Sequence, residues 1–177
     1  AALWAREILP DLRTVFTIHN LAFQGIFPRE SMQWLGLDHT YFKSESIEFW
    51  GQVNYMKAGI TYSDIVTTVS PRYAQEILQP DFGFGLDGLL RAYRHKLFGI
   101  LNGIDTIFFD PEHDPALLHH YNSSSLQAKK LNKDLLCEMR GFEQSDHPLF
   151  IFIGRFTQQK GLDIITEALP RLLKMKL

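Results

Sequence analysis

The sequence predicts an α/β fold with parallel strands, and three observations lead to this prediction. Residues 149–153 form an unbroken apolar run, as expected of a central parallel strand that is covered on both faces. Apolar residues then recur at helical spacing from Leu162 to Leu172. Residues 65–69 form a β-branched run, and Ser70 and Pro71, which follow it, are residue types that cap and open a helix. Strand, loop and helix in this order make half of a βαβ unit.

Composition sets broad limits on what the chain does. Its 177 residues, 45% of them hydrophobic, can bury a sizeable core. The formal net charge of -2 gives no reason to expect a nucleic-acid partner, and no apolar run is long enough to predict a membrane span. Cys137 is the only cysteine, which excludes an internal disulfide, and we place it at least half-buried in a helix. His113, His119 and His120 lack the spacing and companion ligands of a zinc site, so we expect no metal.

The residues that interrupt regular structure divide the chain into elements. Breakers at 36–40 and 44–46 precede a helix that we expect to end near Gly59. Residues 99–101 indicate a short strand that ends at an Asn-Gly turn, and prolines and aspartates punctuate residues 110–115. The serines at 123–125 start a polar helix over 126–139, whose lysines we expect to form a solvated face.

Residues 83–88 spell G-x-G-x-x-G, the dinucleotide-binding fingerprint. That motif has meaning only directly after a hydrophobic strand, and Pro80 and Asp81 exclude such a strand here. We therefore predict a flexible loop that opens a helix over Leu86 to Tyr93.

Two cations lie between the apolar run and the last helix. Arg155 and Lys160 are bracketed by Gly154 and Gly161, so the backbone there can approach a ligand closely. Ligands of parallel sheets bind beyond the carboxyl ends of strands, and the start of the next helix adds free N–H groups and a positive dipole end. Solvated loop cations are the plain alternative, since most Arg and Lys side chains are exposed. The position of the two cations between an expected strand and the start of a helix favours an anion-binding site.

Four segments resemble the glycogen and starch synthases, which are retaining glucosyltransferases of GT-B fold and glycosyltransferase family 5. Residues 154–163 are similar to the donor loop R-x-x-x-x-K-G-x-D of that family. Residues 15–25 are similar to its T-[IV]-H-N-L-A-[YF]-Q-G, and residues 55–77 to its K-A-G-[IL] and following A-D-x-V-T-T-V-S-P segments. Residues 99–105 are similar to its G-I-L-N-G-[IV]-D.

The resemblance implies parts of two Rossmann-like parallel-sheet domains. Residues 1–105 would be the C-terminal part of the N-terminal, acceptor-side domain. Residues 106–177 would be the crossover and the start of the C-terminal domain, which binds the nucleotide-sugar donor. The family's K-x-G-G-L segment and its glutamate-bearing donor motif are not among these residues, so we expect the isolated 177-residue chain to be inactive.

The resemblance also implies roles for individual residues. His19, Arg155 and Lys160 would be catalytic: the cations neutralise the departing diphosphate without a metal ion, and His19 positions and stabilises the donor sugar. The residues expected to bind the donor are Asn20, Asn102, Gly154, Arg155 and Lys160. Gln24 and Gly85 would lie on the acceptor side. A structural role is the alternative for His19, and a plain turn residue is an equally good interpretation of Asn102.

The implied reaction transfers glucose from ADP-glucose to the non-reducing end of an α-1,4-glucan with retention, as in glycogen or starch synthesis. ADP-glucose and the glucan would be the partners, with no cofactor, nucleic acid or membrane; the sequence does not specify an oligomeric state. We expect a bacterial cytoplasmic location, with the plastid stroma as the alternative. Two other functions stay open: a related GT-B transferase that uses UDP-glucose, and an inactive glucan-binding fragment.

Overall fold

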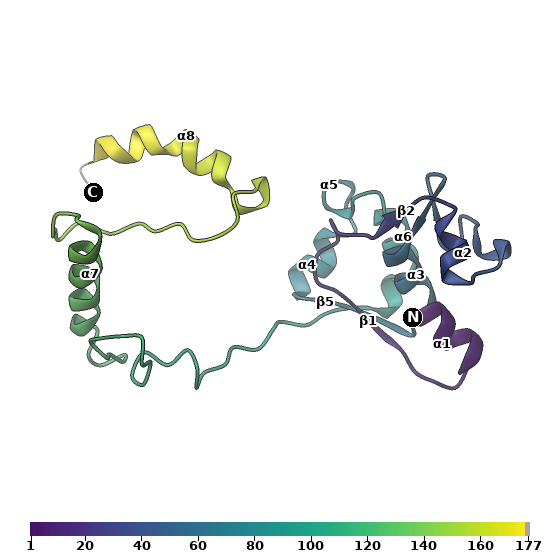
Figure 1. Cartoon of the computed structure of the whole chain (residues 1–177), viewed down its shortest axis with the longest axis horizontal. Coiled ribbons are helices and arrows are strands. Elements are labelled where there is room, and N and C mark those ends of the chain that lie inside the picture. The colour runs from purple at the N-terminus through teal and green to yellow at the C-terminus, as the bar shows by residue number, and fades with distance from the viewer. Residues whose placement is uncertain (176–177) are drawn as a thin grey trace. The chain divides into compact units, whose positions relative to one another are not determined.

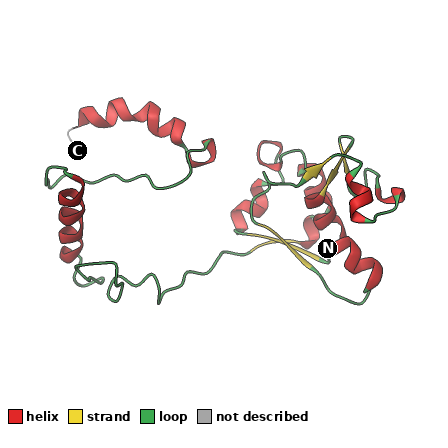
Figure 2. Ribbon diagram, viewed as in Figure 1, coloured by secondary structure: helices red, strands yellow, loops and turns green. Residues whose placement is uncertain are grey.

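The computed structural model describes residues 1–175, except for the side chain of Gln158, and its elements are shown in Figures 1 and 2. The chain forms two compact units, Ala1–Gly103 and Ile104–Leu177. Assignment of these units to the acceptor-side and donor domains over 1–105 and 106–177 stays a prediction.

A three-stranded parallel sheet organises the first unit, which confirms the predicted α/β class. Its strands are β1 (Val15–Ile18), β5 (Ile65–Thr68) and β6 (Leu97–Gly99), in the order β1-β5-β6. Both pairings are parallel, and Ile18 lies opposite Thr68, which lies opposite Gly99. The carboxyl ends of the three strands therefore meet at one edge.

Four helices connect these strands. Helix α3 (Tyr55–Tyr62) precedes β5, and α4 (Pro71–Glu76), α5 (Pro80–Gly83) and α6 (Asp87–Ala92) lie between β5 and β6. The predicted cap of α4 is confirmed, because the Ser70 side chain accepts a hydrogen bond from the Tyr73 amide at 2.9 Å and Pro71 is the first helical residue. The core between sheet and helices consists of Ile18, Leu21, Met56, Ile60, Val66, Ile77, Leu86 and Leu90.

A second, antiparallel sheet in the first unit was not predicted. It contains β2 (Ile26–Phe27), β4 (Gln52–Asn54) and β3 (Glu48–Phe49), in the order β2-β4-β3. Helices α1 (Ala2–Ile8) and α2 (Ser31–Leu35) and the 3₁₀ turn His39–Tyr41 complete this part of the chain. A separate buried cluster of Leu3, Met32, Ile47 and Val53 holds it together. The remaining 3₁₀ turn of this unit, Arg94–Lys96, leads into β6.

Three local predictions for the first unit need correction. Helix α3 runs past Gly59 to Tyr62. The predicted flexible loop over residues 83–88 instead begins at the end of helix α5 and continues through Phe84 and Gly85, both with positive φ, into α6. The strand predicted at residues 99–101 lies two residues earlier, as β6, and residues 102–103 form no turn.

The described residues of the second unit, up to residue 175, form two helices joined by irregular chain, which Figure 2 shows in green. They are α7 (Gln127–Arg140) and α8 (Leu162–Leu172), with 3₁₀ turns at Gln158–Lys160 and Leu173–Met175. Both helices were predicted, and Cys137 is a buried residue of α7 as expected. The predicted solvated lysine face is wrong in part. The Lys133 ammonium donates to the carbonyls of Ser145 and His147, so it fixes the segment after α7.

The predicted strand at residues 149–153 is wrong for this structure. These residues adopt no regular structure, and their exposed fractions range from 37% at Leu149 to 91% at Ile153. A strand needs a neighbouring strand to satisfy its backbone hydrogen bonds, and no described residue of the second unit belongs to a strand. Across residues 1–175, no helix has both the length and the apolar character needed to cross a membrane.

Candidate functional site

His19 lies at the carboxyl edge of the parallel sheet, where ligands of such sheets bind. It directly follows Ile18, the last residue of β1, and its side chain is exposed. The Thr68 hydroxyl donates to the Ile18 carbonyl at 2.9 Å, which ties the ends of β1 and β5 together. The sheet therefore presents His19 from a fixed backbone position.

Hydrogen bonds hold the loop that follows His19. The Asn20 carboxamide oxygen accepts from the Ala22 amide at 3.0 Å, which makes an Asx turn. The Leu21 amide donates to the Tyr73 hydroxyl of α4 at 3.1 Å, while the Leu21 side chain is fully buried. These contacts hold the backbone that follows His19 and Asn20.

Gln24 is buried, with 7% of its surface exposed, and its side chain bonds to the protein. Its amide nitrogen donates to the Phe84 carbonyl at 2.9 Å, and its amide oxygen accepts from Asn54 at 2.6 Å. Asn54 in turn caps α3 by accepting from the Lys57 amide at 2.9 Å. The structure thus places Gln24 beside the loop that contains Gly85, the other residue predicted for the acceptor side, and gives Gln24 a structural part in holding that loop.

A groove of about 340 Å³ opens beside Gly85. It is lined by Ser44, Glu48, Phe49, Trp50, Lys57, Gly85, Leu86 and Leu89. The Lys57 side chain is only 7% exposed, and its ammonium donates to the Glu48 carbonyl at 2.5 Å. Burial lowers the pKa of Lys57, although the Glu48 and Glu45 carboxylates oppose that shift.

Gly85 is the one lining residue that the sequence analysis assigned to a site, and Trp50 and Lys57 are among those that it did not. Lys57 belongs to the K-A-G segment of the family resemblance, which gave it no role in a groove. For Trp50 the available signal was the Trp-Gly pair ahead of Gln52, since a turn there would expose the indole.

The predicted donor loop lies in the second unit, and Gly154, Arg155 and Lys160 are all exposed there. The Thr157 amide donates to the Arg155 carbonyl, and the Lys160 amide to the Thr157 carbonyl, both at 2.9 Å. Gly161, with φ of 68°, is the N-cap residue of α8, so the loop leads directly to a helix N-terminus as predicted. A surface depression of about 570 Å³ beside the loop is lined by Phe156, Thr157, Leu162, Asp163, Thr166 and Glu167, and by neither cation.

The structure groups the predicted residues by unit. His19, Asn20, Gln24 and Gly85 belong to the first unit, and Gly154, Arg155 and Lys160 belong to the second. Asn102 is exposed near the end of the first unit, after β6. The catalytic and binding roles of all these residues stay predictions.

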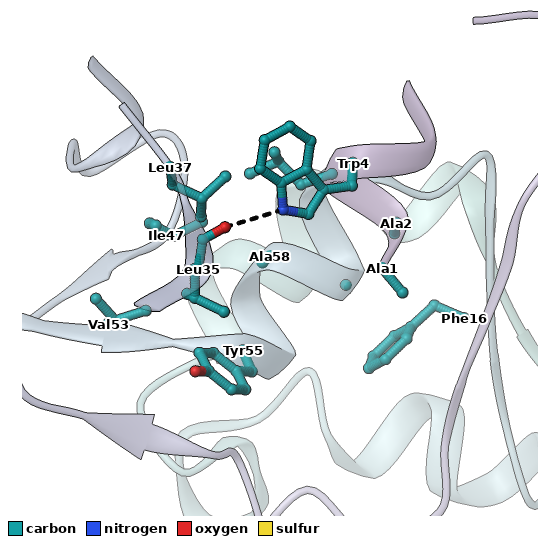
Figure 3. Close-up of a pocket in the computed structure, with 12 residues that line it drawn as sticks. Ala1, Ala2, Trp4, Phe16, Leu35, Leu37, Ile47, Val53, Tyr55 and Ala58 are labelled. Carbon is teal, nitrogen blue, oxygen red and sulfur yellow. Dashed lines mark hydrogen bonds between the residues drawn. The ribbon is translucent and has the colours of Figure 1, made fainter. Parts of the chain in front are cut away.

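An apolar cavity of about 280 Å³ lies elsewhere in the first unit and contains none of the predicted site residues. Figure 3 shows side chains from α1, α2 and α3 around it, with the Trp4 indole nitrogen directed at the Leu35 carbonyl. That hydrogen bond measures 3.2 Å. Carbon atoms dominate the walls, so the cavity offers little to orient a polar substrate.

Comparison with known proteins identifies a family and several relatives that this chain resembles. Residues 1–92 match the family model described as starch synthase catalytic domain. The chain is 46% identical over 163 residues to a glycogen synthase of Thermodesulfovibrio yellowstonii, covering 92% of this chain and 33% of the relative. It is 47% identical over 166 residues to a glycogen synthase of Yersinia pseudotuberculosis, covering 92% of this chain and 35% of the relative.

A solved structure agrees with these relatives. The catalytic domain of Starch Synthase IV from Arabidopsis thaliana, bound to ADP and acarbose, is similar with a TM-score of 0.87 and 37% identity. The similarity covers 97% of this chain and 36% of that one. The chain thus spans about a third of the length of the proteins it matches. Because the family model matches more than half of its residues, the chain belongs to the family of starch synthase catalytic domains, as the sequence resemblance predicted.

Proposed function

We propose that this chain is part of a retaining glucosyltransferase that transfers glucose from ADP-glucose to the non-reducing end of an α-1,4-glucan. Family membership is the observation that carries this proposal. Two further findings support it: relatives of 46% and 47% identity are glycogen synthases, and the similar Starch Synthase IV domain holds ADP and acarbose.

The proposed chemistry places positive charge where the leaving group becomes negative. As the bond from glucose to ADP breaks, negative charge accumulates on the diphosphate. Arg155 and Lys160 are exposed cations on a loop that leads to the N-terminus of α8, whose free N–H groups add to their effect. Groups fixed before the reaction stabilise such charge without reorganising at the moment of transfer.

The sugar needs a different environment, because its anomeric carbon becomes positively charged in the transition state. His19 fits this need as a positioning group. Its backbone follows β1 at the sheet edge, and the hydrogen bonds of Leu21 and Ala22 hold the loop behind it. In the proposed mechanism the His19 carbonyl faces the donor sugar and the imidazole binds a sugar hydroxyl. No cofactor is required, since ADP-glucose is the activated donor.

Replacement of Lys160 by alanine tests the donor loop. We expect Lys160→Ala to lower turnover by about 100–1,000-fold, which corresponds to about 2.7–4 kcal/mol of lost transition-state stabilisation. The assay measures transfer of labelled glucose from ADP-glucose to glycogen, in an enzyme of the relatives' full length that contains this chain. Lys174→Ala, which removes another exposed lysine after α8, is the matched control. Normal turnover in Lys160→Ala would remove Lys160 from the mechanism.

The nucleotide of the donor is tested in the same enzyme. We propose ADP-glucose, so ADP should compete with the donor more strongly than UDP does. Stronger competition by UDP would favour a related transferase that uses UDP-glucose. We further propose that the two units belong to the acceptor-side and donor domains, and that the protein acts in the bacterial cytoplasm, which its bacterial relatives support.

A further inference from the structure

The tip of the β3–β4 hairpin contains a tryptophan in an unfavourable backbone conformation. Phe49 pairs with Gln52, which leaves Trp50 and Gly51 as a two-residue turn. Both have positive φ, 52° for Trp50 and 79° for Gly51, as in a type I′ turn. Asn-Gly is the preferred pair there, because a bulky L-residue is strained in the left-handed region. Trp50 is thus a costly choice for a simple turn.

The indole of Trp50 is also unusually accessible. Its residue is 83% exposed, although tryptophan is highly buried on average. The Glu48 carboxylate fixes the turn by accepting from the Gly51 amide at 2.7 Å. The Phe49 ring meets the indole edge-on, with 6.1 Å between ring centroids and 72° between planes. Backbone strain of this kind concentrates at functional sites, so the exposed ring calls for a functional explanation.

Trp50 forms one side of the groove beside Gly85. A Cβ atom added at Gly85 would lie 3.1 Å from the Phe49 ring and 3.8 Å from the indole nitrogen of Trp50. The bare glycine therefore leaves room next to both aromatic rings. The volume of about 340 Å³ falls within the range of about 300–1,000 Å³ that is typical of ligand pockets.

The polar groups of the groove favour a neutral, hydroxyl-rich ligand. Glu48 and Ser44 line it together with Trp50, and the Ser44 hydroxyl, which donates to the Glu45 carboxylate at 2.8 Å, can still accept hydrogen bonds. A carboxylate accepts hydrogen bonds from sugar hydroxyls but repels phosphate. The one cation of the groove, Lys57, already donates to the Glu48 carbonyl. A sugar ring, with an apolar C–H face and a rim of hydroxyls, matches this combination better than a nucleotide does.

We propose that the groove between Trp50 and Gly85 binds glucose units of an α-1,4-glucan, with one ring stacked on the Trp50 indole and its hydroxyls bonded to Glu48 and Ser44. The choice of glucan rests on the proposed function. Continuity with the predicted site supports it, because Gln24 bonds to the Phe84 carbonyl next to Gly85 and belongs to the same loop as His19. The groove would thus hold acceptor chain on the unit that presents His19.

Maltoheptaose binding to the full chain tests this inference by isothermal titration calorimetry. We expect Trp50→Ala and Trp50→Asn to raise the dissociation constant about tenfold or more, since each removes the stacking surface. Trp34→Ala is a closely matched control, because Trp34 is 84% exposed and lies on α2 outside the groove. Trp34→Ala should bind as the unaltered chain does. Trp50→Phe should recover part of the lost affinity, because it keeps a ring.

Trp50→Asn separates loss of the ligand from loss of the fold. Asparagine suits the left-handed turn better than tryptophan, so its melting temperature should equal or exceed that of the unaltered chain while its glucan affinity falls. Unaltered affinity in Trp50→Asn, or no binding by the unaltered chain, would overturn the inference. Glucose transfer from ADP-glucose to maltose, measured in an enzyme of the relatives' full length that contains this chain, decides the proposed function separately. If glucose is transferred to maltose but glucan binding does not depend on Trp50, only the inference is wrong. If glucan binding depends on Trp50 but no glucose is transferred, only the proposed reaction is wrong.

Discussion

At the scale of single residues, Gln24 shows that a residue in a functional motif can be committed to structure. Gln24→Ala would leave the Phe84 carbonyl and the amide of Asn54, a fully buried residue, without their partner. We expect a loss of about 1–3 kcal/mol in the free energy of unfolding, measured by urea denaturation. Gln33→Ala removes an exposed glutamine of α2 and should change stability by less than about 0.5 kcal/mol.

A different result would reassign Gln24. If Gln24→Ala kept full stability but lost maltoheptaose binding, the side chain would act on the ligand and not on the loop. The sequence could not decide between these roles, because both place a glutamine at the same position of the motif. Ser70 was easier to predict: its hydroxyl bonds to an amide three residues away, so the evidence is local. The partners of Gln24 lie 30 and 60 residues away.

At the scale of elements, Asp64 ties the start of β5 to the start of β1. Its carboxylate accepts from the Thr14 amide at 2.8 Å, the Thr14 hydroxyl at 3.0 Å and Arg13 at 3.2 Å. These bonds, chiefly that of the Thr14 amide, lower the pKa of Asp64 in the folded chain. A lowered folded pKa gives stability that is complete above the unfolded value of about 4 and is lost as pH falls through the folded value.

The pH dependence of unfolding measures this clamp. Urea denaturation between about pH 2.5 and pH 6 should show the unaltered chain losing stability below about pH 4. Asp64→Asn should be less stable than the unaltered chain at pH 6, and the difference should shrink toward low pH as Asp64 becomes protonated. Asp11→Asn, at another exposed aspartate before β1, should leave the pH profile unchanged. Parallel profiles for Asp64→Asn and the unaltered chain would show that the clamp does not contribute to folding.

Two apolar runs explain why some elements were predictable and others were not. Residues 65–68 form β5 because β1 and β6 lie on either side of that segment. Residues 149–153 are all apolar, whereas residues 65–68 include two threonines, yet residues 149–153 form no strand in the described structure. The hydrophobic pattern of a segment indicates which side chains it can bury, but not whether a partner strand is present. A helix needs no such partner, because its backbone N–H and C=O groups bond to one another. Helices α7 and α8 were therefore predicted correctly where the neighbouring strand was not.

At the scale of the whole molecule, the two units differ in how much apolar surface they bury. Two clusters of buried side chains stabilise the first unit. Among the residues described in the second, Cys137 alone belongs to the buried hydrophobic set. Burial of apolar surface is the main favourable term in folding, so we expect the first unit to hold most of the stability.

Amide hydrogen exchange of the full chain, read by mass spectrometry, can resolve this difference. Amides of β1 and β5 donate within a ladder that packs on the buried core, so they should open only with global unfolding and exchange on the order of 1,000-fold more slowly than unprotected chain. Amides of residues 149–153 should exchange near the unprotected rate, because their side chains are exposed and they form no strand. Residues 65–68 are the internal reference, because that segment was also predicted to be a strand and forms β5. Equal protection of the two runs would mean that 149–153 pairs with another segment in solution, and the unequal division of stability would then be wrong.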